Sequence, residues 1–202
     1  MTTTAAPSGT GALKGRPVAT SHAEIEQAAF RLFARHGFEG TTLEAIAREV
    51  GVGRRTLFRY YSSKNDIPWG QFERTLEEFR RMLAEIPDDV PVHEAVQRGV
   101  LRFNEFPQGA RPSHRDRMRL ILTTPELQAH SVLRYADWRQ VICEYVAGRL
   151  GVSPADLLPQ TVGQVSLGLT LAAYGIWLGD ESADLGQTLD QAMAGLREFL
   201  RI

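Results

Sequence analysis

The chain has 202 residues, of which 43% are hydrophobic and 23% are charged, and its formal net charge is -1 at pH 7. These values are typical of a globular protein of one or two domains, and they argue against a wholly disordered chain or a polycation. The single cysteine, Cys143, excludes an intrachain disulfide and a multi-cysteine metal site.

Charge is unevenly distributed along the chain. Residues 1–66 carry nine cations and six anions, whereas residues 67–202 carry fourteen cations and eighteen anions. A basic N-terminal part suggests that a polyanionic partner binds there, although random scatter of charge can also produce a difference of this size.

The first eighteen residues are mainly Thr, Ala, Gly and Pro, with two cations near their end. They have little to bury, so we expect a disordered basic arm, and they lack the apolar core of a signal peptide. The longest apolar run, residues 165–179, is too short to span a bilayer. We therefore expect a cytoplasmic protein without a membrane partner.

Three short helices are predicted between residues 21 and 61. Ser21 and Glu24 have the spacing of a capping box, and apolar residues then recur every three or four positions until Gly37. Thr42 caps a second helix over 43–50, and the glycine-rich turn 51–53 leads into a third helix over 54–61. Two short helices joined by such a turn form a helix-turn-helix unit, here spanning residues 42–61.

The rest of the chain also shows helical patterns. We expect a long fourth helix from Lys64 to about Ile86, followed by helices that end near Pro107, Thr124 and Gly151. A short link over 153–160 precedes the last two helices. Alternating strand patterns are absent from the sequence, so it predicts an all-α fold of about nine helices.

The third predicted helix separates into two faces when its residues are placed at 100° intervals. Leu57 and Tyr61 share an apolar edge, which we predict is core. The other side chains are Arg55, Thr56, Arg59 and Tyr60 on the opposite face, with Arg54 and Phe58 between the two. Arginine can hold the guanine edge with two hydrogen bonds, and tyrosine or Lys64 can bind phosphate. A solvated surface helix is the alternative, which the preceding capped helix and turn disfavour.

The stretch "AAFRLFARHGFEGTTLEAIAREVGVGRRTLFRYYSSKND" resembles the N-terminal domain of the TetR family of bacterial transcriptional regulators, over about residues 19–79. The family pattern is carried by Gly37-Phe38, Thr41-Thr42, Ile46-Ala47, Gly51-Val52, Thr56-Leu57, Tyr60, Ser63 and Lys64. The resemblance implies a homodimer of all-helical subunits that binds a palindromic DNA operator. It further implies transcriptional repression until a small ligand binds the C-terminal domain, here residues 80–202.

The resemblance also implies which residues contact DNA. They are Thr42, Arg54, Arg55, Thr56, Phe58, Arg59, Tyr60 and Lys64. Three positions depart from the pattern, because Gly53 and Phe58 stand where serine and tyrosine are frequent, and Arg55 replaces a residue that is commonly small. Arg16 in the basic arm is expected to reach the minor groove, unless the arm is only a solubilising tail.

The stretch "RYYSSKNDIPWGQF" resembles the regulators associated with mycofactocin biosynthesis. Pro68 is expected in the first turn of the fourth helix, where proline is tolerated. Trp69 is expected to pack between the two domains. The last two helices are rich in small residues, which allow close approach, so we expect a four-helix dimer interface rather than only a monomer core.

A cationic cluster marks the segment "RPSHRDRMR". We expect it to bind the phosphates of an anionic effector, and the candidate residues are Arg98, Arg102, His114, Arg115, Arg117 and Arg119. The resemblance adds acyl-coenzyme A as a ligand class, whereas a solvated arginine face is the alternative.

Enzymatic chemistry is not expected. The triplet His114-Arg115-Asp116 imitates a kinase motif, but the chain is short and lacks a glycine-rich phosphate loop. The histidines lack metal-ligand spacing, so we expect neither a metal nor a cofactor. The sequence predicts a ligand-released repressor, and an activator or ligand-independent DNA-binding protein is the alternative.

Overall fold

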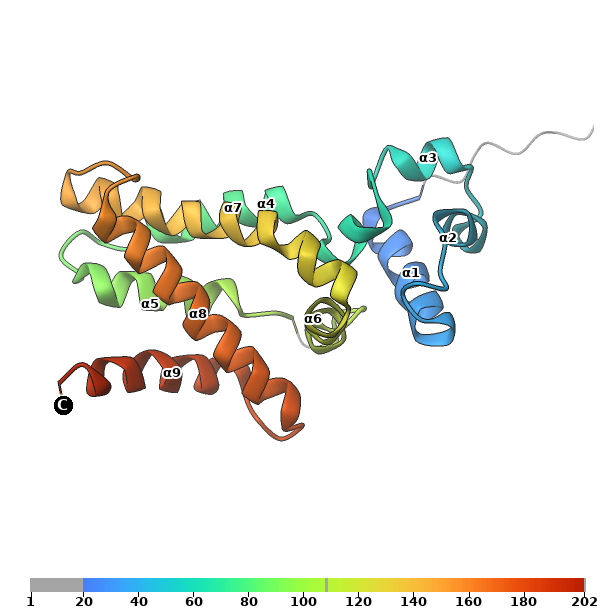
Figure 1. The fold of residues 1–202 in the computed structure, drawn as a ribbon. Coiled ribbons are helices and arrows are strands. Elements are labelled where there is room, and N and C mark those ends of the chain that lie inside the picture. Colours follow the sequence, from blue (N-terminus) through green and yellow to red (C-terminus); the bar gives the residue numbers. More distant parts are fainter. Residues whose placement is uncertain (1–19, 108, 202) are drawn as a thin grey trace, which may run out of the picture.

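A computed structural model describes residues 20–107 and 109–201 (Figure 1). The regular elements of these residues are all helical: α1 (His22–His36), α2 (Leu43–Val50), α3 (Arg54–Phe58), the 3-10 helix η1 (Lys64–Trp69), α4 (Phe72–Ala84), α5 (Val92–Phe103), α6 (His114–Thr123), α7 (Pro125–Leu150), α8 (Leu157–Gly179) and α9 (Leu185–Phe199). The all-α prediction is confirmed. The predicted basic arm, residues 1–18, lies outside the described residues.

The first two helices begin and end where their capping residues predict. Ser21 and Glu24 form the expected capping box at the start of α1, and Gly37 ends that helix with a φ of 73°. The Thr42 side chain accepts a hydrogen bond from the Ala45 N–H at the start of α2. Local side-chain chemistry therefore sets the geometry of the helix-turn-helix unit.

The predicted long helix over residues 64–86 is wrong. The chain instead forms η1, turns at Gly70 and begins α4 at Phe72. Pro68 lacks the N–H that a continuing α-helix requires, and Gly70 has a φ of 62°, which favours glycine. The segment that joins the two parts of the molecule is thus a bent connection rather than a continuous rod.

Two other boundaries also differ from the sequence predictions. Helix α3 ends at Phe58, although the sequence predicts a helix to residue 61. The N–H groups of Arg59 and Tyr60 donate instead to the carbonyls of Thr56 and Leu57, three residues earlier, as in a turn. Helix α8 begins at Leu157, so part of the expected link is helical, with Pro159 in the first turn.

The described residues form a head (20–68) and a body (69–107 and 109–201), which lie at opposite ends of the molecule (Figure 1). Leu127 of α7 and Leu120 of α6 belong to the body but pack into the core of the head. Ile67 belongs to the core of the head, whereas Phe72 belongs to the core formed by α4, α5 and α7. Trp69 packs against the two clusters of the body, which include Phe72 at a ring distance of 5.2 Å. The predicted domain boundary at residues 79 and 80 stays a prediction.

Helix α8 has the length and composition of a membrane span, but it packs between α7 and α9 in the body (Figure 1). Ala173, Tyr174 and Trp177 are buried there. These contacts bury one side of α8 within the body.

Candidate DNA interface and ligand cavity

Helix α3 is the second helix of the helix-turn-helix unit, and we call it the recognition helix because this helix enters the DNA major groove in such units. It lies at the upper edge of the head in the view of Figure 1. Leu57 and Tyr61 are buried, as predicted. The side chains of Arg55 and Arg59 are exposed. Two exposed guanidinium groups at this helix suit contact with phosphates and base edges.

The structure resolves the orientation of Arg54 and Phe58, which the helical wheel left between two faces. Both side chains are exposed. The guanidinium of Arg54 lies 2.9 Å from Glu44 of α2 and 5.3 Å from the centre of the Phe58 ring. Both residues therefore extend the solvent face that begins with Arg55.

Three other predicted DNA-contact residues are bonded to the protein itself. Thr42 caps α2, the Tyr60 hydroxyl donates to the Thr20 carbonyl at 2.6 Å, and Lys64 Nζ donates to the Phe38 carbonyl at 2.8 Å. An ammonium has three donors, so Lys64 keeps capacity for a phosphate. Thr56 is half-buried, and Arg16 lies outside the described residues. Contact of these residues with DNA stays a prediction.

A buried carboxylate, Glu26 of α1, joins the head to the body. Its Oε2 lies 2.5 Å from the guanidinium of Arg117 of α6, and its Oε1 accepts a hydrogen bond from the Tyr61 hydroxyl at 2.6 Å. Arg117 also donates to the Pro68 carbonyl at 2.5 Å. We call this set, Glu26, Tyr61 and Arg117, the Glu26 junction. Burial of the phenol, followed by its bond to Glu26, raises the pKa of Tyr61.

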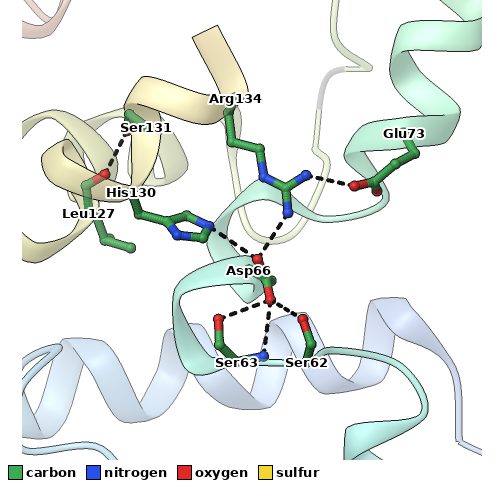
Figure 2. Close-up of polar contacts among 8 residues, drawn as sticks. All are labelled: Ser62, Ser63, Asp66, Glu73, Leu127, His130, Ser131 and Arg134. Carbon is green, nitrogen blue, oxygen red and sulfur yellow. Dashed lines mark hydrogen bonds and ion pairs between the residues drawn. The ribbon is translucent and has the colours of Figure 1, made fainter. Parts of the chain in front are cut away.

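A second polar junction centres on Asp66 of η1 (Figure 2). From α7, His130 Nε2 lies 3.1 Å and Arg134 Nη2 lies 2.9 Å from Asp66 Oδ1. The other carboxylate oxygen accepts from the Ser62 hydroxyl and from the N–H and hydroxyl of Ser63. Burial opposes ionisation, but the serine hydrogen bonds and Arg134 together lower the pKa of Asp66. We call Asp66, His130 and Arg134 the Asp66 junction.

Between these junctions and α8 lies a cavity of about 450 Å³, a size that suits a small-molecule ligand. Its walls come from η1, α4, α5, α6, α7 and α8, and most of its lining is apolar. The principal apolar side chains are Trp69, Phe72, Phe103, Met118, Trp138 and Leu171. Glu26 and Arg117 also line it, so the Glu26 junction is part of the cavity wall.

Three buried polar atoms around this cavity have no hydrogen-bond partner within the described part of the chain. They are Trp69 Nε1, Tyr135 Oη and His114 Nδ1. Buried polar groups normally have partners, so three such atoms on one cavity indicate a place for a ligand's polar group or for water.

His114 is neutral in the folded protein. The Tyr174 hydroxyl donates to Asn104, so its oxygen accepts from His114 Nε2 at 2.9 Å and leaves Nδ1 without a proton. Burial, reinforced by the charge of Arg117, lowers the pKa of His114 to about 3. The cavity thus presents an uncharged acceptor at this position.

This lowered pKa predicts that His114 makes the protein less stable in mild acid. Below pH 6.5 the unfolded chain binds a proton that the folded chain does not, so stability falls as the pH declines from 6.5 towards 3. Between pH 7 and pH 5 the loss from this residue is about 2 kcal/mol. Urea denaturation of the wild type and His114→Gln at both pH values measures it, and equal losses in the two proteins contradict the prediction.

The six predicted effector-binding residues do not gather at one place. Arg98 and Arg102 are exposed on α5 and pair with Glu94 and Glu85. Arg115 donates to three backbone carbonyls at and beyond the end of α8, including that of Trp177, whose ring it also covers. The three guanidinium groups therefore make intramolecular contacts at separate places, and effector binding by the six residues stays a prediction.

The other three predicted residues adjoin open space. His114 and Arg117 line the cavity, whereas Arg119 lines a shallower groove of about 770 Å³ between α1 and α6. Arg31 and Arg111 also line the groove, as does Asp116. The cavity and groove share Ala110 and Pro112, so an apolar chamber adjoins a groove whose lining is also largely apolar and whose charged residues are three arginines and one aspartate.

Sequence reasoning missed the two acidic residues that centre the junctions. Glu26 lies on the apolar side of its helix, one position after Ile25. A carboxylate at such a position is the sequence feature that indicates a buried, paired charge. Asp66 was noticeable only as the third residue after Ser63, where it forms a second capping box. Arg117 of α6 lies 91 residues after Glu26, and the α7 partners of Asp66 lie at least 64 residues after it. Local sequence patterns do not indicate contacts between residues so far apart in the chain.

Models of two protein families match this chain. The model described as bacterial regulatory proteins, tetR family, matches residues 25–67, and the model described as the MftR C-terminal domain matches residues 90–201. A protein of Mycobacterium tuberculosis, named as a mycofactocin biosynthesis transcriptional regulator, MftR, is 46% identical over 178 residues, covering 88% of this chain and 90% of that protein.

Solved structures show the same fold at lower sequence identity. SmeT, the repressor of a Stenotrophomonas maltophilia multidrug efflux pump, has a TM-score of 0.57 and 22% identity, over 89% of this chain and 92% of that one. FadR of Thermus thermophilus, solved with lauroyl-CoA, has a TM-score of 0.54 and 21% identity, over 86% and 92% of the two chains. With its helix-turn-helix head and its MftR-type body, this chain belongs to the TetR family of DNA-binding transcriptional regulators.

Proposed function

We propose that this regulator is a homodimeric repressor that leaves its operator when an acyl-coenzyme A occupies the cavity. The observation that carries the proposal is the adjacency of an apolar cavity to a groove lined by Arg31, Arg111 and Arg119. An acyl chain suits the apolar cavity, and the guanidinium groups of the groove suit the phosphates of the coenzyme.

The uncharged polar atoms in the cavity suit a neutral carbonyl group such as that of a thioester. Trp69 Nε1 and Tyr135 Oη are hydrogen-bond donors without protein partners, and a carbonyl oxygen satisfies such donors without bringing a charge into an apolar site. Glu26 and Arg117, the charged residues of the junction beside them, already neutralise each other. FadR of Thermus thermophilus, which has the same fold, was solved with lauroyl-CoA, and this analogy agrees with the proposal.

Dimerisation is proposed to occur through α8 and α9. Leu157 and Ile176 of α8 and Phe199 and Leu200, at the end of α9, are exposed apolar residues. Gly168 and Gly175 have open space where a side chain would stand, which leaves room for a helix of a second subunit. Two recognition helices related by a two-fold axis read half-sites about 34 Å apart. We propose that the dimer acts in the cytoplasm.

Release of operator DNA by lauroyl-coenzyme A tests the proposed function. Fluorescence anisotropy of a labelled operator should fall as lauroyl-coenzyme A is added, because a ligand that prefers the unbound conformation shifts the equilibrium towards it. Free coenzyme A lacks the acyl chain and lauric acid lacks the phosphates, so each should release much less operator DNA. Undiminished operator binding at saturating lauroyl-coenzyme A contradicts the proposed effector.

A further inference from the structure

We infer that the Glu26 junction transmits the state of the cavity to the recognition helix, and that the Asp66 junction is the fixed point on which the head turns. This inference rests on the proposed function, since it assumes that cavity and operator are coupled. Glu26, Tyr61 and Arg117 are positioning residues in this account.

Only one of the two junctions borders the cavity. The cavity lining includes Glu26, Arg117 and Pro68, whose carbonyl accepts from Arg117. It includes neither Asp66 nor Arg134. A molecule that fills the cavity therefore presses directly on the Glu26 junction and reaches the Asp66 junction only through other residues.

The Glu26 junction has a continuous path to the recognition helix. Each oxygen of the Glu26 carboxylate has its own partner, Arg117 at 2.5 Å on one side and the Tyr61 hydroxyl at 2.6 Å on the other. The Tyr61 N–H donates to the Leu57 carbonyl of α3. Because a buried charge separated from its partner is unfavourable, a shift of Arg117 displaces Glu26 rather than leaving it unpaired. The displacement then reaches Tyr61 and α3.

The Asp66 junction has the properties of a pivot (Figure 2). Asp66 accepts from the two serines before it and from His130 and Arg134 of the long helix α7. Arg134 also binds Glu73 of α4 at 2.6 Å, so its guanidinium spans the bend at Gly70. This network holds η1 against α7 while the chain bends beside it.

Gly70 links the two junctions. It lies between Asp66 and Glu73 in the chain, and a side-chain carbon at this position would lie 3.3 Å from Glu26 Oε1 and 3.4 Å from Arg117 Nη1. The bend therefore touches the Glu26 junction directly. A change in that junction alters the packing at the bend, while the Asp66 junction retains its own bonds.

The test compares two adjacent hydroxyl groups, one from each junction, and requires no effector. Tyr61→Phe removes the hydroxyl that donates to Glu26, and Ser62→Ala removes a hydroxyl that donates to Asp66. Leu171→Trp fills the cavity from α8 and stands in for a ligand, with Leu167→Phe as a second filling variant. Operator affinity is measured by anisotropy for each background with and without the filling substitution, and melting temperatures identify the variants that fold.

We expect cavity filling to weaken operator binding about fivefold or more in the wild-type background, the usual range of allosteric coupling. The ratio of the operator Kd with the filling substitution to the Kd without it should fall close to one in the Tyr61→Phe background. In the Ser62→Ala background it should keep the wild-type value. Equal ratios in all three backgrounds overturn the inference, as does unchanged operator affinity in both filling variants. Because no effector is added, a failure of lauroyl-coenzyme A to release DNA contradicts the proposed effector without affecting this result.

Discussion

Arg117→Met should lower the free energy of unfolding by about 3–5 kcal/mol, because it leaves the buried carboxylate of Glu26 without its cation. The Glu26 and Arg117 side chains retain only 11% and 19% of their exposure, so solvent replaces little of the lost interaction. The Pro68 carbonyl also loses a donor. Urea denaturation at one fixed protein concentration measures the change, since the stability of a dimer depends on concentration.

Two control variants separate the buried ion pair from other effects of losing an arginine. Arg119→Met makes the same substitution at an exposed position of α6 and should change stability by no more than about 0.5 kcal/mol. The double variant Arg117→Met with Glu26→Gln should recover part of the loss, because the neutral amide still accepts the Tyr61 hydroxyl without requiring a cation. If Arg117→Met is as stable as Arg119→Met, the Glu26 junction does not hold the head to the body.

Arg55→Ala should weaken operator binding and change the preferred base at one position of each half-site. The side chain is exposed on the recognition helix, and an arginine that binds guanine through two hydrogen bonds contributes about 1–3 kcal/mol of discrimination. The expected loss is therefore roughly five- to 150-fold for each contact. Anisotropy titrations on the operator and on single-base variants of it measure both effects.

A surface arginine of the body provides the matched control for Arg55. Arg81 lies on α4 with 72% of its side chain exposed, so Arg81→Ala removes the same charge far from the recognition helix. The Arg81→Ala variant should keep the wild-type sequence preference and nearly the wild-type affinity for the operator. An Arg55→Ala protein with the wild-type affinity and preference shows that α3 presents a different face to DNA.

The head was largely predictable from sequence because short-range chemistry determines it. Ser21, Thr42 and Gly51 cap their helices through contacts within a few residues, and the wheel placed Leu57 and Tyr61 in the core. The break at Gly70 was missed because the helical pattern on both sides outweighed the signals of Pro68 and Gly70. A proline in the first turn of a helix and a proline at a break between two helices give the same signal in the sequence.

The cavity and the junctions were less predictable because distant segments form them. Arg117 was selected as a ligand residue for its charge, and the structure shows that Glu26 and two backbone carbonyls already engage it. Arg115 was selected for the same reason, but it binds carbonyls near the end of α8. Local charge density identifies candidate cations, whereas their partners depend on how α1, α6 and α8 pack together.

Selection of bound sequences from random duplex DNA, with the full-length protein, tests most directly whether this chain reads DNA as a two-fold dimer. We expect enrichment of an inverted repeat whose half-sites are centred about one helical turn apart, and loss of one preferred base in each half-site for Arg55→Ala. Absence of any enriched sequence contradicts sequence-specific DNA binding by this chain. Enrichment of a single, non-repeated half-site contradicts the proposed dimer.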